Sequence, residues 1–319
     1  MLESPLVSVI IPTLNRPRLV ESAVKSVSDQ TYEKIEIIVV DDSDYSSTSP
    51  PSFEETNIDI TVLQGETSEG LPHARNRGIE AASGELVAFL DDDDEWKTKK
   101  TEKQVRRFKT RDIGLCTSWR YMVGSDNKVE NVAKTDIEGD LVRKLLCQNV
   151  IGPPSGVMVR QDVIDSVGAF DEEFLLWEDR EWYLRVAQVY DVDCVEEPLV
   201  RYALDSPEKM SGNLTMARNT AYPQLLDKHD QLIKEYERRF VQGWKFRKFG
   251  KMAYDTGSRV TALRYAVQAI ATYPRAWPFY RLFIRSLIGD KIYALLDKTT
   301  MQIRNAVKRW KIRSEAQGS

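Results

Sequence analysis

Residues 7–44 read VSVIIPTLNRPRLVESAVKSVSDQTYEKIEIIVVDDSD, and this stretch decides the fold. It holds two short runs of apolar, β-branched residues, Val7–Ile11 and Ile35–Val40, which are typical of buried strands. Between them, apolar residues recur at helical spacing from Leu19 to Val27. A strand, a helix and a second strand in this order predict a βαβ unit, whose two strands lie parallel in one sheet.

The same alternation of strands and helices continues to about residue 205. Pro12 is expected to end the first strand because proline has no N–H to donate. A helix is predicted over Leu71–Ala82, a further strand over Leu86–Leu90, and a charged helix over Trp96–Thr110. Later elements are predicted at Leu115–Val123, Gly156–Val159, Asp179–Tyr190 (a helix) and Leu199–Ala203. Together they predict an α/β fold with a mostly parallel sheet flanked by helices.

Carboxylates follow two of the predicted strands at their carboxyl ends. Asp41 and Asp42 follow one strand, and four consecutive aspartates, residues 91–94, follow another. Ligands of open α/β sheets bind at this edge, so we expect the two groups to form one site. Clustered carboxylates repel one another, and a hard divalent cation such as Mg²⁺ or Mn²⁺, which prefers oxygen ligands, relieves the repulsion. A solvated acidic turn is the alternative for the run of four.

The composition excludes several classes of protein. A chain of 319 residues, 42% of them hydrophobic, can bury a full core. Three cysteines without a pairing pattern argue against a disulfide framework and for a reducing compartment. Two histidines are too few to favour a histidine-based zinc site. The sequence has no apolar run of about 18 residues and no basic start with an apolar core, so we expect neither a spanning helix nor a signal peptide.

The charges divide the chain into two parts. Residues 1–200 hold 22 Lys and Arg against 39 Asp and Glu, whereas residues 201–319 hold 23 against 10. From about residue 215 the pattern is helical. We therefore expect an α/β domain over residues 1–205 and a helical, basic C-terminal region over residues 206–319.

The basic C-terminal region interleaves its charges with apolar side chains. This pattern is typical of amphipathic helices that lie in a membrane interface and meet anionic headgroups. A layer of helices that only packs on the α/β domain is the alternative, and nothing in the region is similar to a nucleic-acid-binding module. The interleaved residues are Trp277, Phe279, Tyr280, Phe283, Ile284, Ile288, Ile292, Tyr293, Met301, Ile303, Val307 and Trp310.

Four segments in order resemble the family-2 glycosyltransferases of the GT-A fold. They are residues 7–44, LPHARNRGIEAASGELVAFLDDDDEW at 71–96, VGAFDEEF at 167–174 and WEDREWYLRV at 177–186. The resemblance covers roughly residues 5–205. It implies an inverting enzyme that moves one sugar from a nucleotide-sugar, UDP-linked by expectation, with the help of Mn²⁺ or Mg²⁺.

The resemblance assigns the donor site to two loops and one helix. Pro12, Thr13 and Asn15 in the first loop, together with Asp41 and Asp42, match positions that bind the nucleoside. A turn or helix N-cap role is the alternative for the two aspartates. Arg75 resembles the family's diphosphate-facing arginine, and the alternative for it is an ion pair on a helix surface.

The run of four aspartates matches the family's D-x-D motif. Asp91 and Asp93 match the metal-holding positions, and Asp93 is expected to be the closest ligand. Asp92 fills the variable position at the edge of the donor site, and Asp94 extends the cluster. A metal that bridges the diphosphate oxygens neutralises the charge that develops on the leaving group.

Glu178 and Asp179 match the family's E-D motif. An acceptor hydroxyl is a poor nucleophile, so a carboxylate must take its proton, and we assign this role to Asp179 with Glu178 positioning it. The predicted helix start favours the ionised form of Asp179, although helix capping alone would also place an aspartate there. Many relatives carry a histidine after the last core strand. This chain has none there, and Arg201 or Asp205 are candidates to replace it.

These residues predict an enzyme that adds one sugar to a hydroxyl or phosphate acceptor. With a membrane-binding tail, the acceptor would be a glycan precursor on a polyprenyl or dolichyl carrier at the cytoplasmic face of the membrane. Two other functions remain open: a nucleotide-sugar-binding partner subunit without catalysis, and a nucleotidyltransferase. The sequence does not determine the sugar, the base, the linkage or the oligomeric state.

Overall fold

The computed structural model describes residues 4–43, 53, 57–65, 68–204 and 213–293. The chain divides into two compact units, residues 1–211 and 212–319. Both this division and the boundary expected from the sequence fall within residues 205–212, which lie outside the described part of the chain.

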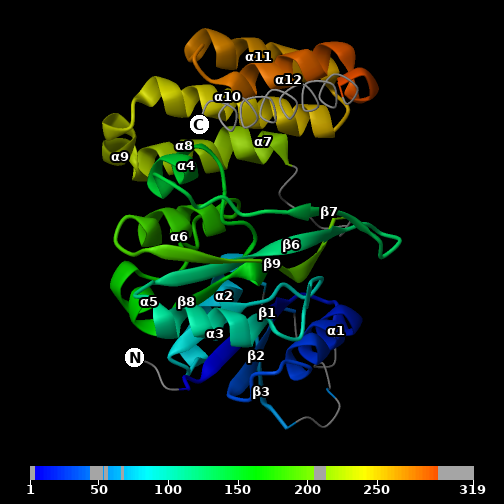
Figure 1. Cartoon of the computed structure of the whole chain (residues 1–319), viewed down its shortest axis with the longest axis vertical. Coiled ribbons are helices and arrows are strands. Elements are labelled where there is room, and N and C mark those ends of the chain that lie inside the picture. The colour runs from blue at the N-terminus through cyan, green and yellow to red at the C-terminus, as the bar shows by residue number, and fades with distance from the viewer. Residues whose placement is uncertain (1–3, 44–52, 54–56, 66–67, 205–212, 294–319) are drawn as a thin grey trace, which may run out of the picture. The chain divides into compact units, whose positions relative to one another are not determined.

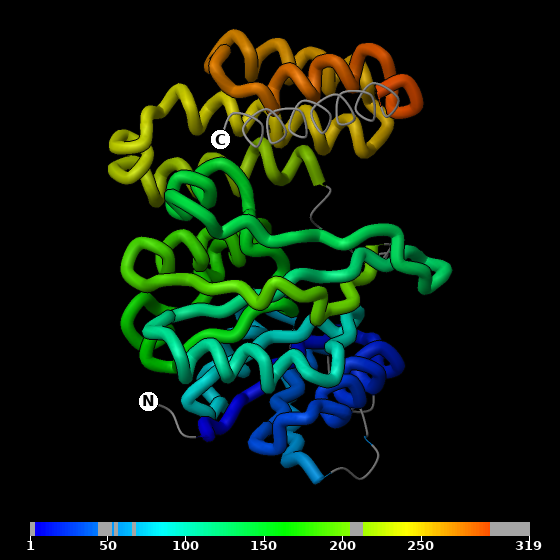
Figure 2. Tube along the Cα trace, viewed as in Figure 1, coloured from blue at the N-terminus to red at the C-terminus, as the bar shows by residue number. Residues whose placement is uncertain are grey.

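The first unit is built on a nine-stranded sheet (Figure 1). Four strands at one end are parallel, as predicted, and the strand that follows them is antiparallel to both of its neighbours. The last two long strands, β6 and β9, are far apart in the sequence but lie side by side and parallel (Figure 2). The order is β3 (Asp59–Gln64), β2 (Ile35–Asp41), β1 (Val7–Thr13), β4 (Leu86–Phe89), β8 (Met158–Arg160), β6 (Leu115–Val123), β9 (Val192–Ala203) and β5 (Glu95–Trp96), and β7 (Val129–Ala133) pairs with β6.

Helices cover both faces of this sheet, and the alternation of side chains in β1 shows why. Val9 and its odd-numbered neighbours belong to the core that α1 (Pro17–Ser28) and α3 (Lys100–Thr110) close on one face. Ile10 points to the other face, where Gly78 of α2 (Leu71–Ala81) lies against it. Phe89, the partner of Ile10 in β4, contacts Trp182 of α6 (Glu178–Ala187) on that same face. Two shorter helices, α4 (Leu141–Cys147) and α5 (Gln161–Val167), complete the unit.

Several boundaries differ from the prediction, and two of the differences have a clear physical reason. β1 continues past Pro12 to Thr13. Beyond Ile10 it pairs with β2 alone, so a residue without an N–H is tolerated there. The helix expected from Trp96 begins only at Lys100, because Trp96 pairs with Val200 of β9 and its indole donates to the Ser155 carbonyl at 2.8 Å.

The second unit is helical. Glycines on α10 allow close packing, because an added Cβ at Gly243 would meet Phe279 and one at Gly250 would meet Leu282. Within the described residues, no helix is long and apolar enough to cross a bilayer. Met301, Ile303, Val307 and Trp310 lie outside those residues. The helices are α7 (Leu214–Met216), a π-helical stretch (Ala217–Ala221), α8 (Tyr222–Lys228), α9 (Asp230–Glu235), α10 (Arg238–Asp255), α11 (Arg259–Thr272) and α12 (Trp277–Ile288).

Candidate active site

The four aspartates after β4 alternate between buried and accessible. Asp92 and Asp94 are buried, whereas Asp91 and Asp93 are partly exposed. The four residues form a turn, which is closed by a hydrogen bond from the Asp94 N–H to the Asp91 carbonyl at 3.0 Å. The run therefore presents two carboxylates to solvent and turns two into the protein.

The two buried aspartates are bound by the protein itself. Asp92 accepts a hydrogen bond from the Thr13 hydroxyl at 2.7 Å and pairs with Arg16 at 3.1 Å. Asp94 accepts from the Ser155 hydroxyl at 2.6 Å and from the Ala203 N–H at 3.0 Å. Burial raises the pKa of Asp92 to about 6 and the pKa of Asp94 well above its ordinary value. The side chains of Thr13 and Asp92 are therefore hydrogen-bonded to each other.

The two accessible aspartates keep free oxygens. Asp91 accepts from Arg75 through Oδ1, and its Oδ2 has no bond to any described residue. Asp93 makes no side-chain hydrogen bond or ion pair within the described part of the chain. Among the described residues there is no group of three or more His, Cys, Asp or Glu that could by itself hold a metal ion. A cation here would need ligands from a substrate as well.

Arg75 connects the strand-end cluster to the start of α6. Its Nη2 donates to Asp91 at 2.7 Å and its Nη1 donates to Glu178 at 2.8 Å. Burial opposes the charge of this guanidinium, which is 1% exposed, but the two carboxylates outweigh burial and raise the pKa of Arg75. Arg75, which was expected to face a diphosphate, therefore binds one protein carboxylate through each of its two Nη atoms.

Asp179 is held beside this bridge. Its Oδ2 accepts from the Asn149 amide at 2.7 Å, and its Oδ1 accepts from the Arg180 N–H at 2.6 Å. Trp177, the residue just before α6, has a positive φ of 69°, which is a strained conformation for a bulky residue. Burial and the neighbouring charge of Glu178 raise the pKa of Asp179 to about 7.

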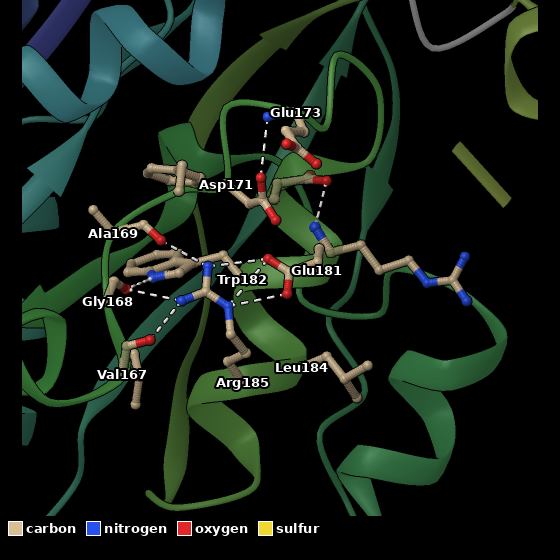
Figure 3. A network of polar contacts seen from close by, with 12 residues as sticks. Val167, Gly168, Ala169, Asp171, Glu173, Glu181, Trp182, Leu184 and Arg185 are labelled. Atoms are coloured by element: carbon tan, nitrogen blue, oxygen red, sulfur yellow. Dashed lines mark hydrogen bonds and ion pairs between the residues drawn. The ribbon is translucent and has the colours of Figure 1, made fainter. Parts of the chain in front are cut away.

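A buried network holds α6 in place (Figure 3). Glu181, which is fully buried, pairs with Arg185 one turn later at 3.0 Å. Arg185 also donates to the carbonyls of Val167 and Ala169, each at 2.6 Å. The Trp182 indole donates to the Gly168 carbonyl at 3.0 Å, so Trp182 packs in the core, as expected. This network anchors the helix whose first turn carries Glu178 and Asp179.

The residues expected to bind the nucleoside make local contacts. Asp42 accepts from the Ser68 hydroxyl at 2.7 Å and from the Gly70 N–H at 3.1 Å, which fixes the loop before α2. Asp41 accepts from the N–H and hydroxyl of Ser43, and the Ser43 hydroxyl in turn accepts from the Asn15 N–H at 2.9 Å. The contacts of Asp41 with Ser43 are those of a turn, whereas Asp42 holds a loop that lies 26 to 28 residues further along the chain.

The sequence did not single out Arg120 of β6. Its guanidinium makes no hydrogen bond or ion pair to any described residue, and burial lowers its pKa. The charged or ionisable groups that face it are Tyr202, Tyr183, Asp94 and Asp179. Gly152, with φ of 109°, leaves room for it, because a Cβ there would meet Arg120 Nη1.

The structure describes one of the two candidates for the place of the missing histidine. Arg201 pairs with Glu95 at 3.2 Å and donates to Asn127, and Asp205 lies outside the described residues. The only sequence signal for Arg120 was a charged residue within the predicted strand over Leu115–Val123.

The family model described as "Glycosyl transferase family 2" matches residues 8–168. The chain belongs to this family. As a family-2 glycosyltransferase it is an enzyme, and its α/β domain has the GT-A fold that the four segments implied. The matched span includes β1, β2 and the four aspartates but ends before Glu178 and Asp179.

Relatives of this family-2 glycosyltransferase cover most of the chain. It is 30% identical to the "Uncharacterized glycosyltransferase YwdF" of Bacillus subtilis, over 70% of this chain and 84% of that protein. It is 36% identical to the "UDP-Glc:alpha-D-GlcNAc-diphosphoundecaprenol beta-1,3-glucosyltransferase WfgD" of Escherichia coli, over 39% of this chain and 49% of that protein. The structure of the "Mannosyltransferase PcManGT from Pyrobaculum calidifontis in complex with GDP-Man and Mn2+" matches with a TM-score of 0.54 and 18% identity, over 89% of this chain and 84% of that one.

Replacing Arg185 by methionine should destabilise the domain by about 3–5 kcal/mol, because a fully buried Glu181 would lose its cation. Urea unfolding followed by circular dichroism measures the change. The double variant Glu181→Gln, Arg185→Met also removes the buried carboxylate that has lost this ion pair and should recover part of the loss. Equal stability of the wild type and Arg185→Met would contradict the anchoring role of the network.

Proposed function

We propose that this enzyme transfers a single sugar from a nucleotide-sugar, with inversion, to a hydroxyl of a lipid-linked or surface glycan precursor. The supporting observation is the Arg75 bridge. It joins the aspartates after β4 to the first turn of α6, so a candidate metal ligand and a candidate base belong to one site. Inverting transfer needs both: a charge sink for the leaving group and a base for the acceptor.

In this proposal Asp179 takes the proton of the acceptor hydroxyl. A carboxylate with a pKa near 7 is a stronger base than an ordinary one and is still ionised at neutral pH for about half of the molecules. Asn149 orients it through Oδ2, and Arg75 holds Glu178 beside it. The strained Trp177 conformation sets the direction in which the first turn of α6 leaves the loop.

Asp93 and the free oxygen of Asp91 would hold Mn²⁺ or Mg²⁺ together with the donor's diphosphate. Two protein carboxylates suit a cation that takes its remaining oxygens from phosphates and water. The bound ion would neutralise charge on the departing nucleoside diphosphate. Asp92 and Asp94 shape this turn from within through Thr13, Arg16, Ser155 and Ala203.

We assign the diphosphate-facing role to Arg120 rather than to Arg75. Arg75 already carries two carboxylates, whereas Arg120 has no described partner and lies among Asp94, Asp179 and Tyr202. A guanidinium is a good phosphate ligand because its fork of N–H groups matches two oxygens. Pro12, Thr13, Asn15, Asp41 and Asp42 would frame the nucleoside through the backbone that their mutual hydrogen bonds hold.

Relatives support the donor and acceptor classes that we propose. WfgD is named for a UDP-linked glucose donor and an undecaprenol-linked acceptor, and we propose the same classes here. On α12, Trp277 and Leu287 expose apolar surface (60% and 58%), next to the basic Arg281. Such a helix suits peripheral contact with the cytoplasmic face of a membrane, where a lipid-linked acceptor would lie.

Asp179→Asn should lower the rate of sugar transfer about 10²–10⁴-fold and leave UDP affinity unchanged, because the amide cannot accept the acceptor's proton. The wild-type kcat/KM should rise with pH around an apparent pKa near 7, since only ionised Asp179 acts as a base. This rise should vanish in the variant.

UDP release from a panel of UDP-sugars, with calorimetric titration of UDP, measures both quantities. A variant that keeps the wild-type rate would favour the non-catalytic partner subunit or a capping role for Asp179. Formation of a nucleotide-sugar from a sugar phosphate would instead favour the nucleotidyltransferase.

Asp93→Asn should weaken UDP binding at least tenfold when Mn²⁺ is present, because the variant loses the carboxylate that would hold the metal. When a chelator removes the metal, the affinity for UDP should change little. Asp94→Asn is the matched control. Burial raises the pKa of Asp94 and so favours its neutral form, and a neutral amide has nearly the same shape, so metal-dependent binding should persist. Calorimetry with and without Mn²⁺ separates them. Equal losses in both variants would count against the assignment of the metal to Asp93.

Arg120→Gln should lower kcat about 10²-fold, because a cation that meets the departing diphosphate acts mostly in the transition state. Arg201→Gln removes a cation of the same strand region that pairs with Glu95 instead, and its kcat should stay near that of the wild type. Steady-state kinetics with the best donor measures both. If Arg201→Gln is the slower enzyme, Arg201 is the diphosphate contact and Arg120 is not.

A further inference from the structure

The helical unit contains a groove of about 840 Å³. It lies between α8, α10 and α11, and Arg218 of the π-helical stretch reaches its rim. This volume is within the range of pockets that hold small organic ligands. The residues assigned to sugar transfer all belong to the other unit, so the groove is a separate feature.

One wall of the groove is a continuous row of aromatic rings. Tyr222 contacts Phe249 with ring centres 5.9 Å apart, and Phe249 contacts Tyr265 at 5.7 Å. Tyr265 is stacked on Phe246 at 6.4 Å. Four rings from three helices therefore line this wall, with neighbouring rings meeting edge to face except for the stacked pair, and they suit a ligand with an apolar body.

The same groove gathers cations that have no carboxylate partner. Within the described residues, Arg218, Lys245 and Arg264 make no hydrogen bond or ion pair. Lys245 instead lies over two of the rings, with Nζ 4.7 Å from the centre of Tyr222 and 4.6 Å from that of Phe246. Burial lowers the pKa of Lys245, and the like charge of Arg218 lowers it further.

The carboxylates of the groove do not balance these cations. Asp230 is already engaged by Lys234 at 2.6 Å and by Arg238. Asp227 remains as one carboxylate against three cations. Elsewhere on α10 the usual arrangement holds, because Lys251 pairs with Asp255 one turn later. Like charges that are held together without counter-ions cost free energy, which a bound anion would offset.

We propose that this groove binds a phosphate group that carries an apolar body. The phosphate would lie between Arg218, Lys245 and Arg264, and the body would lie on the rings of Tyr222, Phe249 and Tyr265. A phosphate with two negative charges matches the excess of cations, and guanidinium groups bind it through paired hydrogen bonds. The proposal does not depend on sugar transfer, since no residue assigned to that reaction lines the groove.

Two sources supply this chemistry: the headgroup of an anionic lipid and a free phosphate ester. Calorimetric titration of the full chain with dihexanoyl phosphatidic acid, kept below its micellar concentration, tests the first. Phenyl phosphate, a free phosphate ester with an aromatic body, tests the second. Binding of the phosphatidic acid alone indicates a lipid source. Comparable binding of phenyl phosphate indicates a free phosphate ester.

The variant Arg218→Gln, Lys245→Gln should lose at least tenfold in affinity for the ligand that binds. Glutamine keeps part of each apolar stem, and the loss of like-charge repulsion means that the melting temperature should not fall. Lys251→Gln is the control, because it removes one cation from the same helix outside the groove. The proposal is overturned if neither phosphate ligand binds the wild type, or if Lys251→Gln weakens binding as much as the groove variant.

Discussion

The catalytic unit depends on one buried cation. Arg75 is enclosed by protein and holds Asp91 with one nitrogen and Glu178 with another. Removing such a charge from water costs free energy, and the two hydrogen-bonded carboxylates offset this cost. The residues it joins are 87 positions apart in the chain, on opposite sides of a sheet edge. Without this bridge, the Asp91 cluster and the first turn of α6 would repel each other.

The bridge also explains how four adjacent aspartates divide their roles. The turn directs Asp92 and Asp94 inward, where hydroxyl and N–H donors satisfy them. One oxygen of Asp91 accepts from Arg75, and Asp93 has no described partner. A run of like charges in the sequence thus becomes two buried carboxylates, one that is shared with Arg75 and one that has no described partner. The four side chains are chemically identical, and only their surroundings distinguish them.

The sequence predicts the features that depend on local pattern. The alternation in Val7–Ile11 and the carboxylates at strand ends locate the sheet and its functional edge, and the family resemblance names the fold. The sequence does not predict the partners of Arg75. Whether this arginine contacts substrate or protein depends on where α6 packs against the sheet, which no local pattern determines. Sequence analysis did not identify Arg120 for the same reason. We assigned it a role because of Asp94, Asp179 and Tyr202, which act on its charge. All three are distant from Arg120 in the chain, and only the fold brings them close to it.

The raised pKa values in the site also tie folding to acidity. Asp92 and Asp179 have native pKa values of about 6 and 7, and that of Asp94 is also raised, whereas an unfolded aspartate titrates near pH 3.9. Between about pH 4 and pH 7 the native chain therefore holds protons that the unfolded chain has released. Through these three groups, the free energy of unfolding falls as the pH rises across that window. The site contributes most to stability when it is protonated and unable to act as a base.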